Sequence, residues 1–379
     1  MTETDDSADD EYEFESPHET EGFDSGRGVE TKGSSGSDGP ETEGFCVDDV
    51  VAHGGTVEAF LADGGDNLVA DGGLVDETGD DVDDAPVVVK IGGARAVNPE
   101  GAVQDVAHLV ANGRQVVVVH GGSTAVDETL EELGEEPTYV ETPSGVTGRF
   151  TDERAMEVFT MVMPGKLNTD LVATLRAAGV DALGLSGVDG GLLTGKRKSA
   201  VRVVEDGKKK IKRGDHSGKI ESVNADLLGT LLDAGHVPVV TVPMLADDGV
   251  PVNADADRAA AAVAGALGAQ LVVLTDVSGV YEDPDDPETL VSSATTPADL
   301  EALQGAAEGF MTKKVMAAVE ALEGGAAEVV VADANLRDPI TNALGGGGTH
   351  VSPGVLGDAS GVGDADDGIG GDEAGEVEQ

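Results

Sequence analysis

Two apolar stretches that each end in a pair of glycines decide the fold: PVVVKIGG (residues 86–93) and QVVVVHGG (residues 115–122). A continuous run of valine and isoleucine, without polar alternation, is typical of a strand buried on both faces of a sheet. The glycines lead into stretches with helical periodicity, AVQDVAHLVANG (residues 102–113) and STAVDETLEELG (residues 123–134). Buried strand, glycine turn and helix, in this order, form the repeating unit of a parallel sheet.

The same alternation continues to about residue 356. Further helix–strand pairs are DLVATLRAAG before DALGLSG, ADLLGTLLDAG before HVPVVTVPML, DRAAAAVAGALG before AQLVVLTDVSG, and KVMAAVEALEGG before AAEVVVAD. These helices end at glycine, a frequent C-terminal cap. We therefore predict an α/β fold in which an open, mostly parallel sheet carries helices on both faces.

The two ends of the chain have a different composition. Residues 1–50 hold 17 acidic and two basic residues among Ser, Gly and Thr, which leaves too little apolar surface to offset the entropy of ordering. Within residues 51–85, a stretch that could form a short helix precedes the acidic linker DETGDDVDD. We predict that residues 1–85 are an acidic, largely disordered extension and residues 357–379 a disordered acidic tail, neither taking part in catalysis.

Composition excludes several classes of protein. The 379-residue chain has 74 acidic and 23 basic residues, a net charge of −51, whereas general binders of nucleic acid are basic. The single cysteine, Cys46, rules out an internal disulfide and a cysteine-based metal cage. Without a signal peptide or a long apolar run, we expect a cytoplasmic protein that does not span a membrane. Acidic residues also crowd the loops between the predicted elements, which indicates adaptation to a high-salt cytoplasm.

Glycine-rich turns are expected where ligands bind, beyond the carboxyl ends of the strands. They lie at residues 90–93, 120–123 and 185–189. Such turns could serve only to join a strand to a helix. Lys90 favours a binding role, because a lysine at the end of a buried strand is costly unless its charge meets an anion such as phosphate. The chain has no Walker A sequence and no HRD or DFG motif, so phosphoryl transfer would require another family.

Six motifs resemble the amino-acid kinase family, of which N-acetylglutamate kinase is the best-known member. They are VVVKIGG, VVVVHGG, RFTD (residues 149–152), PVNADADRAA (251–260), LTDVSGVY (274–281) and a late Met-x-x-Lys (311–314), in the family's order between about residues 86 and 356. The resemblance implies an acyl-acceptor lobe at about residues 86–240 and a nucleotide lobe at about 241–356. It also implies a homodimer that uses ATP, with Mg²⁺ not held in a protein cage.

Within the family, two segments are similar to the LysW-dependent kinases, which act on glutamate or 2-aminoadipate attached to a small acidic amino-group carrier protein. These segments are YVETPSG (residues 139–145) followed by GRFTD, and residues 184–228. Ser123 stands where N-acetylglutamate kinases usually have a third glycine. The resemblance thus implies ATP-dependent phosphorylation of a side-chain carboxylate in arginine or lysine biosynthesis.

The roles of single residues follow from their places in these motifs. Lys90 matches the lysine that neutralises the transferring phosphoryl group, Lys314 the one at the leaving phosphate oxygens, and Asp257 the residue that organises both. From residue type alone, Asp257 could equally be an acid in the first turn of a helix. Because a carboxylate nucleophile is already ionised at neutral pH, the reaction needs charge cancellation and alignment rather than a general base.

Further positions match the substrate and nucleotide sites of the family. Gly121 and Gly122 match backbone amides that hold a substrate carboxylate, Arg149 the arginine that grips the α-side carboxylate, and Asn253 a substrate-binding asparagine. The nucleotide-binding positions are Gly92, Gly93, Thr275, Asp276, Gly279 and Tyr281.

A basic segment stands out in this acidic chain. Residues 196–219 contain ten of the 23 basic residues, and SAVRVVEDGKKKIKR alternates around Asp206-Gly207 as a β-hairpin would. Runs of charge are usually only solvated surface. Because lysine is scarce elsewhere, we interpret the cluster as a docking surface for an acidic carrier protein, centred on Lys208, Lys209, Lys210, Lys212 and Arg213.

Two alternatives remain open at this stage. An N-acetylglutamate kinase acting on the free acetylated amino acid would share the motifs but leave the basic hairpin unexplained. A non-catalytic nucleic-acid-binding module could use KKKIKR, but it lacks interleaved aromatic residues and leaves Lys90 and Lys314 without a role. The sequence does not distinguish glutamate from 2-aminoadipate, which differ by one methylene.

Overall fold

The computed structural model describes residues 85–92, 99–143, 147–205, 208–307 and 310–357. All of these described residues belong to one compact unit. The predictions of disordered ends and of a short helix within residues 51–85 fall outside the described residues.

Most strands join one large sheet, with order β11-β13-β12-β10-β1-β2-β8-β6-β7 and with β5 and β9 also paired to β8. The strands are β1 (Val87–Ile91), β2 (Val116–His120), β5 (Ala182–Gly187), β6 (Leu193–Glu205), β7 (Lys208–Val223), β8 (Val237–Ala246), β9 (Pro251–Val252), β10 (Gln270–Thr275), β11 (Ser293–Ala294), β12 (Glu328–Asp333) and β13 (Thr349–Val351). β3 (Tyr139–Glu141) and β4 (Thr147–Arg149) form a separate antiparallel pair.

The central strands β12, β10, β1, β2 and β8 run parallel, whereas β6–β7, β8–β9 and β12–β13 are antiparallel pairs. The prediction of a mostly parallel sheet is therefore confirmed. The β1 strand extends one residue beyond Lys90, which sequence analysis had placed at its end.

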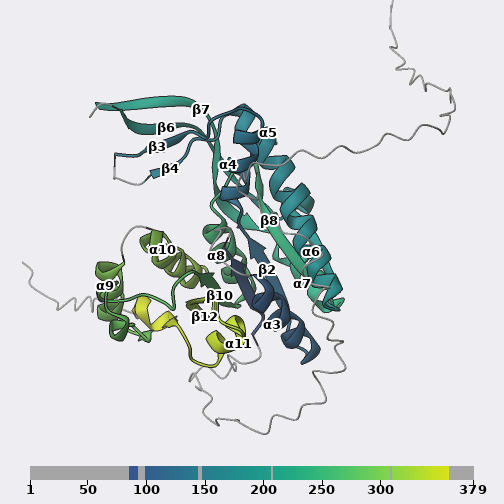
Figure 1. Cartoon of the computed structure of the whole chain (residues 1–379), viewed down its shortest axis with the longest axis vertical. Coiled ribbons are helices and arrows are strands. Elements are labelled where there is room, and N and C mark those ends of the chain that lie inside the picture. The colour runs from purple at the N-terminus through teal and green to yellow at the C-terminus, as the bar shows by residue number, and fades with distance from the viewer. Residues whose placement is uncertain (1–84, 93–98, 144–146, 206–207, 308–309, 358–379) are drawn as a thin grey trace, which may run out of the picture. The chain divides into compact units, whose positions relative to one another are not determined.

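Helices cover both faces of the sheet, as Figure 1 shows. They are α3 (Pro99–Ala111), α4 (Ser123–Glu132), α5 (Glu153–Thr160), the π-helical stretch η2 (Met161–Leu167), α6 (Asn168–Ala177), α7 (Ala225–Asp233), α8 (Ala256–Leu267), α9 (Pro297–Ala306), α10 (Phe310–Glu323) and α11 (Pro339–Leu344), with short 3₁₀ turns η3 (Asp189–Gly191), η4 (Pro287–Thr289) and η5 (Pro353–Leu356).

The two faces of the sheet make two separate cores. Val87, Val89 and Ile91 of β1 pack with side chains of α3, α6 and α11 in one core. Val88 belongs to the other core, with side chains of α4, α5, η2, α7, α8, α9 and α10. Because successive side chains of a strand alternate between faces, Lys90 lies on the same face as Val88, toward α8. This parity brings the lysine to the helix that carries Asp257.

The basic segment forms the predicted hairpin. β6 and β7 pair antiparallel from Leu193↔Val223 to Glu205↔Lys208, so the hairpin extends beyond the predicted residues 196–219 at both ends. In Figure 1 its strands run beside β3 and β4, and β3 contacts β6.

The division into two lobes, with a boundary at about residue 240, stays a prediction. A cut at about residue 240 would pass through β8, which pairs with β2 on one side and with β5 and β6 on the other. Residue 240 itself therefore lies inside a strand.

Candidate active site

Two lysines share one carboxylate at the carboxyl ends of the central strands. The Lys90 Nζ atom lies 2.7 Å from Oδ1 of Asp257, and the Lys314 Nζ atom lies 3.8 Å from Oδ2 of the same residue. All three side chains are largely buried, with exposed fractions of 7%, 16% and 13% for Lys90, Asp257 and Lys314. The structure thus brings together the three residues assigned to catalysis from distant parts of the sequence: β1, α8 and α10.

Asp257 is held by the first turn of α8. Asp255 caps this helix, and its side chain accepts hydrogen bonds from the amides of Asp257 and Arg258. Burial by itself would raise the pKa of Asp257, but the charges of Lys90 and Lys314 outweigh it, and the net pKa is lowered. Asp257 is therefore an ionised carboxylate between two cations. The alternative interpretation, that Asp257 is only an acid in the first turn of a helix, agrees with its position but does not explain the two lysines beside it.

The surroundings of Lys314 disfavour its charged form, whereas those of Asp257 favour the charged form. Burial and the neighbouring charge of Lys90 lower its pKa, and Asp257, Asp255 and Asp276 offset only part of this effect. Two close cations and one carboxylate leave a local surplus of positive charge. An anion placed between the lysines would relieve their repulsion, which is what a phosphate group can do.

The neighbouring Lys313 is oriented differently. Its Nζ atom donates a hydrogen bond of 3.2 Å to the carbonyl oxygen of Thr147 in β4. Since Lys314, and not Lys313, forms the ion pair with Asp257, the structure favours Lys314 as the second lysine of the cluster.

The glycine turn after β2 presents fewer free amides than expected. The Gly121 amide already donates to the carbonyl oxygen of Ile91 at 3.2 Å, so it is occupied within the sheet. Gly122 is the N-cap of α4, and no side chain caps that helix. The uncapped first turn of α4 therefore remains available to an anion. Packing also requires Gly122 to be glycine, because a Cβ there would meet the side chains of Leu167 and Met163.

Arg149 is anchored beside this helix terminus. Its guanidinium makes a 2.6 Å ion pair with Asp127 of α4 and donates to the carbonyl oxygen of Ser123 at 2.9 Å. The Tyr139 hydroxyl donates to Asp127 at 2.7 Å, and the guanidinium lies 5.4 Å from the centre of the Tyr139 ring. Arg149 thus lies against the α4 turn that begins at Gly122, so a carboxylate bound at that turn would be within reach of its charge.

Asn253 is bound to the same motif from another side. Its side-chain amide donates to the hydroxyl of Thr151 at 3.0 Å, and Thr151 is fully buried two residues after Arg149. The predicted substrate residues Arg149 and Asn253 are therefore linked through Thr151, a residue that sequence analysis did not single out.

The predicted nucleotide positions lie at the end of β10 and in the loop that follows. β10 is the parallel neighbour of β1, in register with Lys90 opposite Val273. The Thr275 hydroxyl bonds to Asp276, whose charge also acts on Lys314. Gly279 is required by packing, because a Cβ would approach the Thr349 hydroxyl to 2.5 Å, and Tyr281 pairs with Leu290. Gly92 ends the described part of its turn, and Gly93 falls outside the described residues.

The docking residues predicted on the hairpin are mostly exposed. The exposed ones are Lys208, Lys209, Lys210 and Arg213. Of these, Lys210 also forms an ion pair with Glu205 at 2.8 Å. Lys212 differs, because its ammonium lies 4.1 Å from the centre of the buried Phe150 ring, next to Arg149. Ile211, between them, is 63% exposed.

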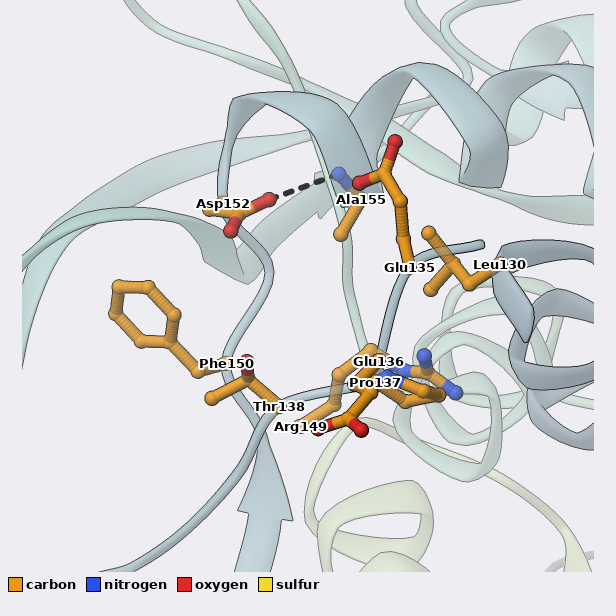
Figure 2. Close-up of a pocket in the computed structure, with 9 residues that line it drawn as sticks. All are labelled: Leu130, Glu135, Glu136, Pro137, Thr138, Arg149, Phe150, Asp152 and Ala155. Carbon is orange, nitrogen blue, oxygen red and sulfur yellow. Dashed lines mark hydrogen bonds between the residues drawn. The ribbon is translucent and has the colours of Figure 1, made fainter. Parts of the chain in front are cut away.

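Described residues line a small cavity near Arg149 and a larger one elsewhere. One of about 20 Å³, with room for about one water molecule, is lined by Arg149, Phe150, Asp152 and neighbours (Figure 2). A larger one of about 450 Å³ lies between α6 and β5. Neither is lined by Lys90, Lys314 or Asp257.

Two negative findings concern the described residues only. Among them, no group of three or more His, Cys, Asp or Glu side chains is arranged to hold a metal ion. Within the same ranges, no helix is both long and apolar enough to cross a membrane.

Sequence analysis missed the residues that hold the predicted substrate-binding side chains in place. Asp127 fixes Arg149, and Asp215 bonds to Thr151. Asp127 is one of several acids in α4. Asp215 lies in a charged strand within residues 184–228, where the resemblance assigned no role to this residue. Their partners are 22 and 64 residues away, so only the fold reveals them.

Comparison with known proteins places the chain in a family. The sequence model of the Amino acid kinase family matches residues 85–333. The chain is 44% identical over 267 residues to a [LysW]-aminoadipate kinase of Deinococcus radiodurans, covering 70% of this chain and 91% of that protein. It is 43% identical over 268 residues to a [LysW]-aminoadipate kinase of Thermus thermophilus, covering 70% and 99%. An acetylglutamate kinase of Methanopyrus kandleri is 43% identical over 247 residues, covering 64% and 93%.

Solved structures give the same fold. The N-acetylglutamate synthase of Neisseria gonorrhoeae, complexed with coenzyme A and N-acetyl-glutamate, superposes with a TM-score of 0.58 at 25% identity, covering 71% of this chain and 59% of that one. The carbamate kinase of Giardia lamblia bound to AMP-PNP reaches a TM-score of 0.51 at 15% identity, covering 72% and 99%. With the family model spanning residues 85–333 and relatives above 40% identity, this chain belongs to the amino acid kinase family.

Proposed function

We propose that this protein transfers the γ-phosphoryl group of ATP to the side-chain carboxylate of glutamate or 2-aminoadipate while that amino acid is attached to an acidic amino-group carrier protein. The step would belong to lysine or arginine biosynthesis. The observation that carries the phosphoryl-transfer part is the Lys90–Asp257–Lys314 cluster, in which two buried cations share one carboxylate.

The cluster suits the central difficulty of this reaction, which is bringing two anions together. Lys90, near the end of β1 and just before the first glycine turn, would face the transferring phosphoryl group, and Lys314 the oxygens left on the nucleotide. Asp257 would keep both lysines charged and oriented between turnovers. Preorganised charges of this kind stabilise a transition state without any reorganisation cost.

ATP and Mg²⁺ fit the residues present. The two lysines supply donors for phosphate oxygens, and Thr275 and Asp276 lie on the adjacent strand end. Mg²⁺ bound to the nucleotide would neutralise phosphate charge. It needs no protein cage, since it commonly keeps its waters and phosphate ligands.

Acceptor binding would use the other side of the glycine turn. The uncapped turn at Gly122 and the anchored Arg149 present amides and a guanidinium near each other, a combination suited to carboxylates. Asn253 would add a side-chain amide from the loop before α8.

The carrier-protein part of the proposal rests on relatives and on the hairpin. The Deinococcus and Thermus relatives are named as kinases of a [LysW]-linked substrate. The hairpin offers exposed basic side chains with the exposed Ile211 among them. An acidic protein that contributes one apolar side chain would complement this surface. We also propose that the enzyme works in a high-salt cytoplasm and as a homodimer.

Turnover measurements test this function directly. Phosphoryl transfer, measured as the formation of ADP and acyl phosphate from ATP, would be followed at high KCl with carrier-linked glutamate, carrier-linked 2-aminoadipate and free N-acetylglutamate. We expect turnover with at least one carrier-linked acceptor and little with the free one. Because one relative is an acetylglutamate kinase, free N-acetylglutamate is a serious alternative acceptor. Faster turnover with free N-acetylglutamate than with either carrier-linked acceptor would replace our proposal with N-acetylglutamate kinase activity.

A further inference from the structure

Asp215 is a fully buried acidic residue that the proposed function does not use. It lies about halfway along β7, with an exposed fraction of 0%. One carboxyl oxygen accepts a hydrogen bond from the amide of Thr151 at 3.2 Å, and the other accepts from the hydroxyl of Ser217. Both oxygens therefore have partners, and one partner belongs to the segment that carries Arg149.

Thr151 is the centre of a wider network. Its carbonyl oxygen accepts from the amide of His216 at 2.6 Å, and its hydroxyl accepts from the side chain of Asn253 at 3.0 Å. The backbone of Asn253 is in turn bound to β7. Its backbone amide donates to the His216 carbonyl oxygen at 2.7 Å, and its backbone carbonyl oxygen accepts from the Gly218 amide at 2.8 Å. Three chain segments are thus fastened to one another at a buried point.

Two of these segments carry proposed acceptor-binding residues, and the third carries the docking surface. Arg149 precedes Thr151 by two residues, Asn253 contacts it directly, and Lys208 to Arg213 lie on the same strand as Asp215. A strand rises about 3.3 Å per residue, so the centre of the basic run lies roughly 15 Å from Asp215 along β7. A continuous strand therefore connects the docking surface to the residues that would hold the amino acid.

We propose that Asp215 is a positioning residue: through Thr151 it fixes Arg149 and Asn253 to the hairpin strand, so that a carrier docked on the hairpin presents its carboxylate in line for transfer. The inference rests on the function proposed above. It adds a residue that touches neither substrate nor nucleotide.

The chain supplies a matched control in Asp105. This residue is also buried, at 4% exposure, and accepts hydrogen bonds from the amides of Ile340 and Thr341 and from the Thr341 hydroxyl. It joins α3 to α11 and contacts none of the acceptor-binding residues. Asp105→Ala and Asp215→Ala both remove a buried acceptor, but only the second disturbs Thr151.

The experiment compares Asp215→Ala, Asp215→Asn and Asp105→Ala in the full chain at high KCl. The readouts are kcat per folded enzyme, KM for ATP and the Kd of the carrier protein without its amino acid. We expect Asp215→Ala to lower kcat by about a hundredfold, as small misplacements of reacting groups do, with the carrier Kd and the KM for ATP unchanged. Asp215→Asn should keep kcat near the parent value, because an amide can still accept from Thr151 and donate to Ser217.

Several outcomes would overturn the inference. These are an unchanged kcat in Asp215→Ala, an equal loss in Asp105→Ala, or an equal loss in Asp215→Asn. Failure of the proposed function is recognised separately, in the parent enzyme. If the parent prefers free N-acetylglutamate, the three variants are compared on that acceptor, where Arg149 and Asn253 must still be placed and the same loss is expected.

Discussion

Lys90 and Lys314 lie on different elements, yet each depends on Asp257 for its charge balance. Both should act on charge that develops during transfer, and not on ground-state binding. We therefore predict that Lys90→Ala and Lys314→Ala lower kcat by about 10²–10³-fold, the usual effect of removing one stabilising donor, with much smaller changes in the KM for the carrier substrate. Steady-state kinetics with carrier-linked acceptor measure this.

Lys313→Ala is the matched control for Lys314→Ala. It removes the neighbouring lysine of the same helix, whose ammonium is directed to the Thr147 carbonyl and not to Asp257. We expect a clearly smaller loss of kcat. A near-parental kcat in Lys90→Ala or Lys314→Ala would remove that lysine from the mechanism. A larger loss of kcat in Lys313→Ala than in Lys314→Ala would assign the role to Lys313 instead.

His350 allows a test of how pH affects stability. It pairs with Glu328, the first residue of β12, at the end of that strand opposite to the candidate active site. Its ring lies 2.8 Å from Glu328, and this contact raises the pKa of His350 above its ordinary value of 6.5 despite partial burial. A raised pKa in the folded state stabilises the protein fully below 6.5, and this contribution is lost as the pH rises through the folded-state pKa. We predict that the melting temperature of the parent exceeds that of His350→Gln most at pH 6, and that the gap narrows toward pH 8.5. A gap independent of pH would show that the ion pair contributes nothing.

At the scale of elements, sequence patterns predict the sheet well because they are local. The valine runs of β1, β2 and β12, and the glycines that end the helices, specify buried parallel strands regardless of what surrounds them. The position of the hairpin follows from alternation and a glycine turn. Its true length was missed, because β6 continues to Leu193 without a change in composition.

Only those residues of the candidate site that lie in a sequence motif could be predicted. Lys90, Arg149 and Lys314 lie in recognisable motifs, but their partners depend on the fold. Gly121 was expected to offer its amide to a ligand, and its bond to Ile91 arises only when β1 and β2 pair. Asp215, likewise, becomes informative only after β7 is placed beside Thr151. Buried polar partners far apart in sequence leave no local signal.

The hairpin itself can be tested by charge reversal. We predict that changing Lys208, Lys209 and Arg213 together to Glu raises the KM for carrier-linked substrate by about tenfold or more, equivalent to about 1.4 kcal/mol. At molar salt the Debye length is about 3 Å, so this effect must come from close contacts and should persist at high KCl. The KM for ATP should stay the same. Lys212 is left intact because it lies over Phe150, next to Arg149.

Lys166→Glu with Arg337→Glu is the control, since both residues are exposed and lie on η2 and beside α11, away from the hairpin. An equal rise of carrier KM in this control would mean that overall charge, not the hairpin, governs docking. A joint collapse of ATP binding in the hairpin variant would place the hairpin over the nucleotide.

For the whole molecule, the question is what the acidic ends contribute. Residues 1–84 and 358–379 carry 35 of the 74 acidic residues and two of the 23 basic ones, so the remaining chain has a net charge of −18 instead of −51. The family match begins at residue 85, and the residues of both cores lie between Val87 and Val355. We predict that deleting both ends leaves kcat and the carrier KM within about twofold of the parent at high KCl, because neither end has the composition to add to a core. Kinetics and thermal melting of the truncated protein measure this. A truncated protein that melts cooperatively at the parental temperature but has lost activity would show that the acidic ends supply part of the site.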